Sequence, residues 1–180
     1  PGSGTNFMAE VVLKALGIPL NSFKDSRLSF TESANALKDG TIEVGTWSVG
    51  PGTSSILDLS TTHDINIISF TPDQTKKILE ANKTYSSVDL AGGVYRGVDK
   101  AVPTIGVWNV MICQASLDTD LVYKLVKALY EHNDYLRKIH PSAAYTTPEN
   151  AVNYSPIPLH PGTIKYLKEK GITVPANLIP

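Results

Sequence analysis

The fold of this chain is decided by its opening stretch, PGSGTNFMAEVVLKALG (residues 1–17), which joins a glycine-rich turn to an amphipathic run. Apolar side chains recur there at the spacing of one helical face, at Phe7, Met8, Val11, Val12, Ala15 and Leu16. A helix is therefore predicted from Thr5 to Leu16. Gly17 and Pro19 predict its C-terminal end, because glycine stops helices and proline cannot continue one.

Elements that alternate in type follow this helix up to residue 82. Short strands are predicted at 27–30, 41–47 and 65–70. Helices are predicted from a capping box at Ser29 to Gly40, at 54–59, and from Thr71-Pro72 to about Asn82. This order predicts an α/β fold with a mainly parallel sheet flanked by helices. A helix that opens on a glycine-rich turn is normally fed by a strand, so we expect the chain to begin inside a larger fold.

The second half of the chain has a different order. Residues 83–103 are predicted to be an irregular, glycine-containing loop, and long loops of this kind often carry function. The longest predicted strand follows at 104–113 and the longest predicted helix at 120–139. Two short helices are expected near 148–152 and 162–170.

Composition and charge exclude several classes of protein. With 42% hydrophobic residues the chain can build a core, and a net charge of −1 argues against a nucleic-acid partner. No stretch approaches the ~20 apolar residues of a membrane helix. The single cysteine, Cys113, rules out an intrachain disulfide, and it is expected to be a small buried residue in the predicted strand.

The opening turn is the first candidate for a binding site. Ser3, Gly4 and Thr5 precede the first helix, and free backbone N–H groups and hydroxyls at a helix N-terminus form a ready anion site. The turn lacks the lysine of a phosphate-binding loop and the full dinucleotide fingerprint. The alternative interpretation is an ordinary helix cap at Thr5.

Two later segments are further candidates. Thr46, Trp47 and Ser48 follow a predicted strand, and open α/β sheets bind ligands beyond the carboxyl ends of their strands. The alternative there is a turn with a core tryptophan. Tyr95 and Arg96 lie in the glycine-rich loop, where the tyrosine could cover a ligand and the arginine could pair with a carboxylate. A solvated loop arginine is the alternative for Arg96.

A search for catalytic residues finds no mechanism. The histidines are scattered and show no metal-ligand spacing, and no nucleophile elbow is present. His63 and His160 stand beside predicted turns, where capping is their expected role. We therefore expect a binding protein without a metal or cofactor, and no enzyme.

The order of several short motifs carries a family resemblance over essentially the whole chain. They are Pro1 to Thr5, Ser29 to Glu43 with its Ala36-Leu37-Lys38-Asp39-Gly40, Trp47 and Gly50, Asp58-Leu59, Thr62-His63-Asp64, Tyr95 and Gly97, Val102-Pro103-Thr104, Pro158 to Gly162, Tyr166, and Glu169-Lys170-Gly171. In this order they resemble the TAXI family, the extracytoplasmic solute receptors of certain TRAP transporters.

The resemblance implies a two-lobed fold like that of periplasmic binding proteins, with most of the first lobe absent from this chain. Residues 1–102 would form the second lobe, and residues 103–180 would supply a hinge strand and C-terminal helices that return towards the first. The receptor would capture a small, glutamate-like carboxylate in the interlobe cleft and dock on the membrane subunits of the transporter in the periplasm. The implied ligand contacts are Ser3, Gly4, Thr5, Thr46, Trp47, Ser48 and Tyr95.

The sequence also departs from the family pattern. Gly45-Thr46-Trp47 stands where relatives often have successive aromatics, which predicts a roomier and more polar pocket. Three alternatives stay open: a receptor of an ABC transporter, the ligand-binding module of a sensor, and an enzyme of the porphyrin-synthase type. The last would need a cofactor-bearing cysteine in a loop, whereas Cys113 is predicted in a strand.

The first prediction concerns affinity. A micromolar receptor needs about 8 kcal/mol of binding free energy, more than one half of a cleft should supply. We expect the 180-residue chain to bind carboxylates weakly or not at all. Tight carboxylate binding measured by isothermal titration calorimetry would contradict this expectation.

Overall fold

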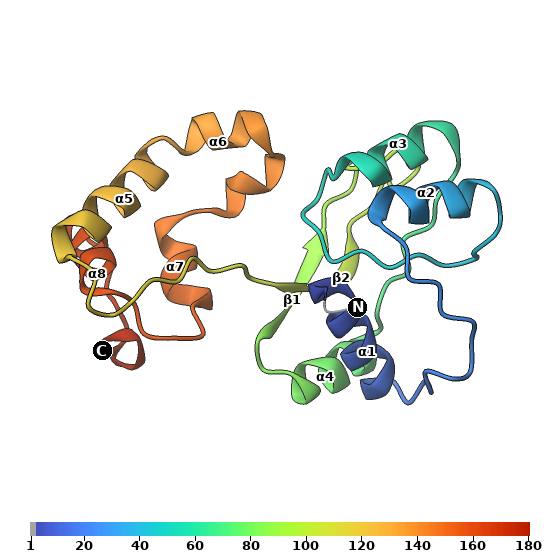
Figure 1. Ribbon diagram of the computed structural model, residues 1–180, viewed down its shortest axis with the longest axis horizontal. Coiled ribbons are helices and arrows are strands. Elements are labelled where there is room, and N and C mark those ends of the chain that lie inside the picture. The colour runs from blue at the N-terminus through green and yellow to red at the C-terminus, as the bar shows by residue number, and fades with distance from the viewer. Residues whose placement is uncertain (1–2) are drawn as a thin grey trace. The chain divides into compact units, whose positions relative to one another are not determined.

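A computed structural model describes residues 3–180 and divides the chain into two compact units, Pro1–Val107 and Trp108–Pro180. Helices predominate in both units, and the described part contains one two-stranded sheet (Figure 1). None of the helices in residues 3–180 combines the length and the apolar composition that crossing a membrane requires.

The helices of the first unit lie close to their predicted positions. They are α1 (Gly4–Ala15), α2 (Phe30–Lys38), α3 (Ser54–Thr62) and α4 (Pro72–Ala81). Helix α2 packs beside α3, and α1 packs beside α4 (Figure 1). The mixture of helices and strands is consistent with part of a binding-protein-like fold.

Local capping explains where these helices begin. The Ser29 hydroxyl accepts the Glu32 N–H at 3.3 Å, and the Glu32 carboxylate accepts the Ser29 N–H at 2.8 Å. Thr71 and Gln74 form the same reciprocal pair at the start of α4. Such boxes satisfy two backbone donors that a helix end leaves free, so they set the helix start from nearby sequence alone.

The predicted parallel sheet is wrong for the described residues. Strands β1 (Tyr85–Leu90) and β2 (Val102–Val107) pair in antiparallel register, from Tyr85 opposite Val107 to Leu90 opposite Val102. Strand β1 lies within the segment predicted to be irregular. The three segments predicted as strands, 27–30, 41–47 and 65–70, form no strand there.

The physical reason is that alternation of apolar residues reports burial and does not supply a backbone partner. Ile65 and Ile67 do pack against the core, as their pattern predicts. Their segment meets the sheet through one hydrogen bond, from the Phe70 N–H to the Pro103 carbonyl at 3.2 Å. A strand requires a continuous ladder of such bonds.

Two apolar clusters hold the first unit together. Val12 of α1, Ile78 of α4, Tyr85 of β1 and Ile105 of β2 form the first cluster. The second joins Ile56 of α3 to Tyr95 and Val98, with Trp47 packed against it. The second cluster therefore connects α3 and both loops that contain predicted ligand residues.

The second unit consists mainly of helices: α5 (Thr119–Glu131), α6 (Asn133–Ile139), α7 (Pro148–Tyr154), α8 (Pro161–Glu169) and the short 3₁₀ turns η1 (Pro141–Tyr145) and η2 (Ala176–Leu178). The single long helix predicted at 120–139 is divided between α5 and α6. The division falls at His132, and the Asn133 amide donates to the carbonyls of Ala143 and Thr146 at 2.9 and 3.0 Å. This tertiary contact holds the chain in a turn that helical periodicity does not reveal.

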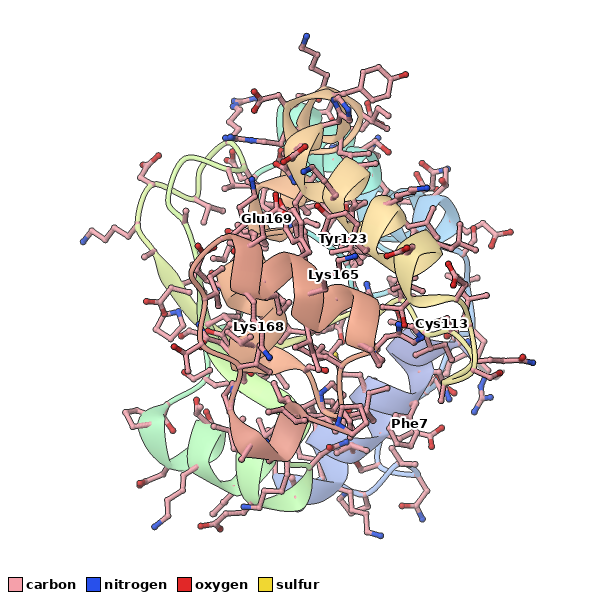
Figure 2. The ribbon with its side chains drawn as sticks, turned by 90° about the vertical axis from the view of Figure 1, so that its left-hand side faces the viewer. Phe7, Cys113, Tyr123, Lys165, Lys168 and Glu169 are labelled. Atoms are coloured by element: carbon pink, nitrogen blue, oxygen red, sulfur yellow. The ribbon has the colours of Figure 1, made fainter. Side chains whose placement is uncertain are left out.

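Helices α5 and α8 pack closely at Gly162. A Cβ there would lie 2.5 Å from the Thr119 carbonyl oxygen and 2.7 Å from the Tyr123 nitrogen, so only glycine fits without movement of the backbone. Figure 2 shows Tyr123 of α5 beside Lys165 and Glu169 of α8. Ion pairs join the two helices, from Lys127 to Glu169 at 3.0 Å and from Lys165 to Asp120 at 2.7 Å.

The expected burial of Cys113 is also wrong. Strand β2 ends at Val107, and residues 108–113 form no strand. Met111 is 84% exposed, and Cys113 is an exposed free thiol (Figure 2). Trp108 is half-buried and stacks on Tyr154, whereas residues 109–113 are exposed and have no strand partner within residues 3–180. Cys113 therefore does not lie in a strand, and a strand position no longer counts against a cofactor-bearing cysteine.

Acid should weaken the contact between α5 and α8. Hydrogen bonds from Tyr123 and Lys127 hold the pKa of the Glu169 carboxyl below its usual value of 4.5. A carboxylate whose folded-state pKa is depressed stabilises the fold above its unfolded pKa, and this stability is lost as pH falls through the folded value. We expect Glu169→Gln to flatten the acid limb of unfolding between about pH 5 and pH 2.

Urea unfolding followed by circular dichroism over this pH range measures the effect. Glu149→Gln is the control, because Glu149 forms no salt bridge within residues 3–180. Equal pH dependence in both variants would contradict the prediction.

Candidate functional site

The site predicted from the opening turn lies at the N-terminus of α1. Ser3 is the N-cap, and its hydroxyl accepts the Asn6 N–H at 3.2 Å. A helix cap is therefore present, but at Ser3 and not at Thr5 as the alternative interpretation had it, and it uses one acceptor site of the Ser3 hydroxyl. Gly4 and Thr5 begin the helix, where backbone N–H groups have no intrahelical carbonyl to reach. Pro1 and Gly2 lie outside the described residues.

A second predicted segment meets this helix end. The Ser48 N–H donates to the Thr5 hydroxyl oxygen at 3.4 Å, across 43 positions of sequence. Thr46 is exposed and Ser48 is half-buried. Neither of their hydroxyls has a hydrogen-bond partner within residues 3–180. The structure therefore brings the Ser48 backbone of one predicted segment to Thr5 of another.

Trp47 is anchored between the site and the core. Its ring packs on the cluster around Ile56 and Tyr95, and Gly45 leaves space for it. The indole Nε1 is buried and has no acceptor within the described part of the chain. A buried donor without a partner is uncommon in native proteins and calls for a specific explanation, such as a bound water or ligand.

Tyr95 occupies a different environment from the one expected of a ligand cover. Its side chain is only 3% exposed, and its hydroxyl accepts the Gly52 N–H at 3.2 Å. Direct contact between Tyr95 and a solute stays a prediction. The positive φ of Gly52, 82°, is the local feature that marks this turn.

Arg96 has a structural partner in the described chain. One of its guanidinium nitrogens donates to the Thr61 carbonyl at 2.6 Å, in the last turn of α3. A cation is favourable at that position because carbonyl groups at a helix C-terminus carry partial negative charge.

Phe7 is more exposed than the sequence pattern predicts. Helical periodicity puts it on the buried face of α1, yet its side chain is 60% exposed (Figure 2). It lies two positions after Thr5 in α1, so the two side chains leave the helix on different faces. The helix has only part of its apolar face covered, mainly around Val12.

The chemistry of this site is that of hydrogen-bond donation. The first turn of α1 contains no acidic residue, whereas α2, α4, α5 and α7 each carry one. The partial positive charge at the start of α1 is thus left for an external anion. No group of three or more metal-ligating side chains is present within residues 3–180.

The histidines have capping roles where the structure gives them partners. The His160 Nδ1 accepts the Gly162 N–H at 3.1 Å at the start of α8, as its position beside a turn predicts. His140 accepts the Ser142 N–H in the same way. The His63 ring lies 2.9 Å from the Thr62 hydroxyl.

Two hollows in residues 3–180 lie away from the predicted ligand residues. The hollow beside α4 is lined by Phe70, Pro72, Thr75, Lys76, Leu79, Glu80, Lys83, Ser87 and Pro103. A second hollow follows α8. Neither contains a predicted ligand residue, and the site geometry consequently rests on hydrogen bonds around α1.

Gly45→Ala should displace Trp47. The new Cβ would lie 2.2 Å from Cζ3 and 2.5 Å from Cη2 of the indole, too close for any real contact. We expect the indole to move towards water and its fluorescence to shift to longer wavelength. The measurement uses a Trp108→Phe background, since the chain has 2 tryptophans. Thr46→Ala, at an exposed neighbour, is the control, and an equal spectrum for both variants would contradict the packing.

Comparison with known proteins assigns a family to this arrangement. A family model matches residues 1–171, which is nearly the whole chain. The model describes a family of the periplasmic-binding-protein type, whose members are typically extracytoplasmic and have a broad solute-binding role. The chain belongs to the NMT1-like family.

Proposed function

We propose that this chain is the solute-binding part of a TAXI-type TRAP receptor that captures a small, glutamate-like carboxylate outside the cytoplasm. The observation that carries the proposal is the hydrogen bond from the Ser48 N–H to the Thr5 hydroxyl. It brings the Ser48 backbone to the first turn of α1, where the Gly4 and Thr5 N–H groups have no intrahelical partner. The hydroxyls of Thr46 and Ser48 are proposed as further donors to the carboxylate. Binding of this kind requires neither a metal nor a catalytic group.

In the proposed site, the binding free energy has two sources: the partial charge of the helix N-terminus and hydrogen bonds to the carboxylate. A helix N-terminus contributes about 0.3–1 kcal/mol to an anion when exposed and up to ~2 kcal/mol when partly buried. Hydrogen bonds to a charged group contribute about 1.5–3 kcal/mol each. The Gly4 and Thr5 N–H groups and the two hydroxyls must therefore supply most of the binding free energy.

The family match supports solute binding in general, and the order of sequence motifs favours TRAP membrane subunits as the partner.

Solution NMR tests the proposal, because it detects weak binding. Glutarate is titrated into the ¹⁵N-labelled chain, with the uncharged isostere glutaramide as a control. We expect glutarate alone to shift the amide signals of Gly4, Thr5 and Ser48. Thr5→Val should weaken binding about threefold to tenfold, since it removes one hydroxyl that both receives Ser48 and faces the anion.

Thr31→Val is the matched control, because Thr31 is exposed on α2 and lies outside the proposed contacts. Equal shifts with glutarate and glutaramide, or shifts confined to residues away from α1 and 46–48, would overturn the proposed function.

A further inference from the structure

The loop at residues 92–98 is a closed turn with little freedom. The Gly93 N–H donates to the Val98 carbonyl at 2.7 Å, and the Val98 N–H donates to the Tyr95 carbonyl at 3.1 Å. A Cβ on Gly92 would lie 2.3 Å from the Asp99 carbonyl oxygen, so the backbone approaches itself as closely as glycine permits. These contacts fix the backbone of the turn, from which the neighbouring side chains of Tyr95 and Arg96 extend.

The two side chains hold opposite ends of α3. The Tyr95 hydroxyl accepts the N–H of Gly52, which directly precedes the N-cap residue Thr53. Arg96 donates to the Thr61 carbonyl in the last turn. A nine-residue helix is about 13 Å long, so adjacent residues of one loop reach both ends of this element.

Of these two contacts, the one made by Tyr95 lies close in sequence to the proposed ligand residues 46–48. Gly52 lies four positions after Ser48, whose N–H reaches Thr5. Between them, the Thr53 hydroxyl donates to the Gly50 carbonyl at 2.8 Å and turns the chain into α3. Residues 48–53 are therefore fixed at one end by Thr5 and at the other by Tyr95.

We propose that Tyr95 is a positioning residue, whose hydroxyl fixes Gly52 and thereby holds Thr46 to Ser48 in place beside the N-terminus of α1. This inference rests on the proposed function, because it concerns the geometry of the same carboxylate site. Tyr95 does not need to touch the solute for this role. Arg96 acts as the second anchor of the loop by holding the far end of α3.

Tyr95→Phe tests the role, since it keeps the buried ring and removes only the hydroxyl. Tyr85→Phe is the matched control: Tyr85 is also buried, at 8% exposed, and its hydroxyl makes no hydrogen bond to residues 46–53. The readouts are hydrogen exchange at the Gly52 amide, the chemical shift of the Ser48 amide, and the dissociation constant for glutarate.

We expect Tyr95→Phe to speed Gly52 exchange by about threefold to tenfold, the range for one lost hydrogen bond. The Ser48 signal should move, and glutarate binding should weaken by a similar factor. Tyr85→Phe should leave all three readouts close to wild type. A conservative loss of one hydroxyl in the core alone would affect both variants alike.

Two results would overturn the positioning role: equal effects of both variants, or faster Gly52 exchange with unchanged Ser48 shift and glutarate affinity. Equal shifts with glutarate and glutaramide in the wild-type chain would refute the proposed function separately. The Gly52 and Ser48 amides would then still decide whether Tyr95 positions the loop.

Discussion

The hydrogen bond between the Ser48 N–H and the Thr5 hydroxyl joins two segments that lie 43 positions apart, and the candidate site depends on it. Without that contact, α1 would simply begin at an ordinary serine N-cap, and residues 46–48 would form a loop unconnected to it. With it, the Ser48 backbone meets a helix end that carries no acidic residue of its own. The proposed carboxylate site rests on this arrangement, because a helix N-terminus with unpaired backbone N–H groups favours an anion.

The surrounding packing explains how an extended loop keeps such geometry. The cluster around Ile56, Tyr95 and Val98 receives Trp47 from the loop that carries the donors. Apolar burial is non-directional, so it holds the loop near α3 without selecting an orientation. Hydrogen bonds at Gly52 and Thr53 add the directional part. Membership of the NMT1-like family is in keeping with a scaffold that places loops for solute binding.

The second unit is stabilised in a different way. Helices α5 and α8 meet where Gly162 lets their backbones approach, and a surface network of lysines and carboxylates surrounds Tyr123. Exposed ion pairs contribute little individually, so the close packing and the stacked rings of Tyr130 and Tyr166 supply most of the contact. This unit contains none of the predicted ligand residues.

The sequence by itself determined the helix starts and several ends, because caps such as Ser29 with Glu32 act within one turn. It also indicated the separate segments of the candidate site, since hydroxyl-bearing residues and glycines can be recognised from the local sequence. The tertiary structure alone decided strand pairing, the exposure of Cys113, the break at His132 and the partner of the Tyr95 hydroxyl. Each of these depends on a group distant in sequence, and periodicity records which side chains avoid water but not which partner covers them.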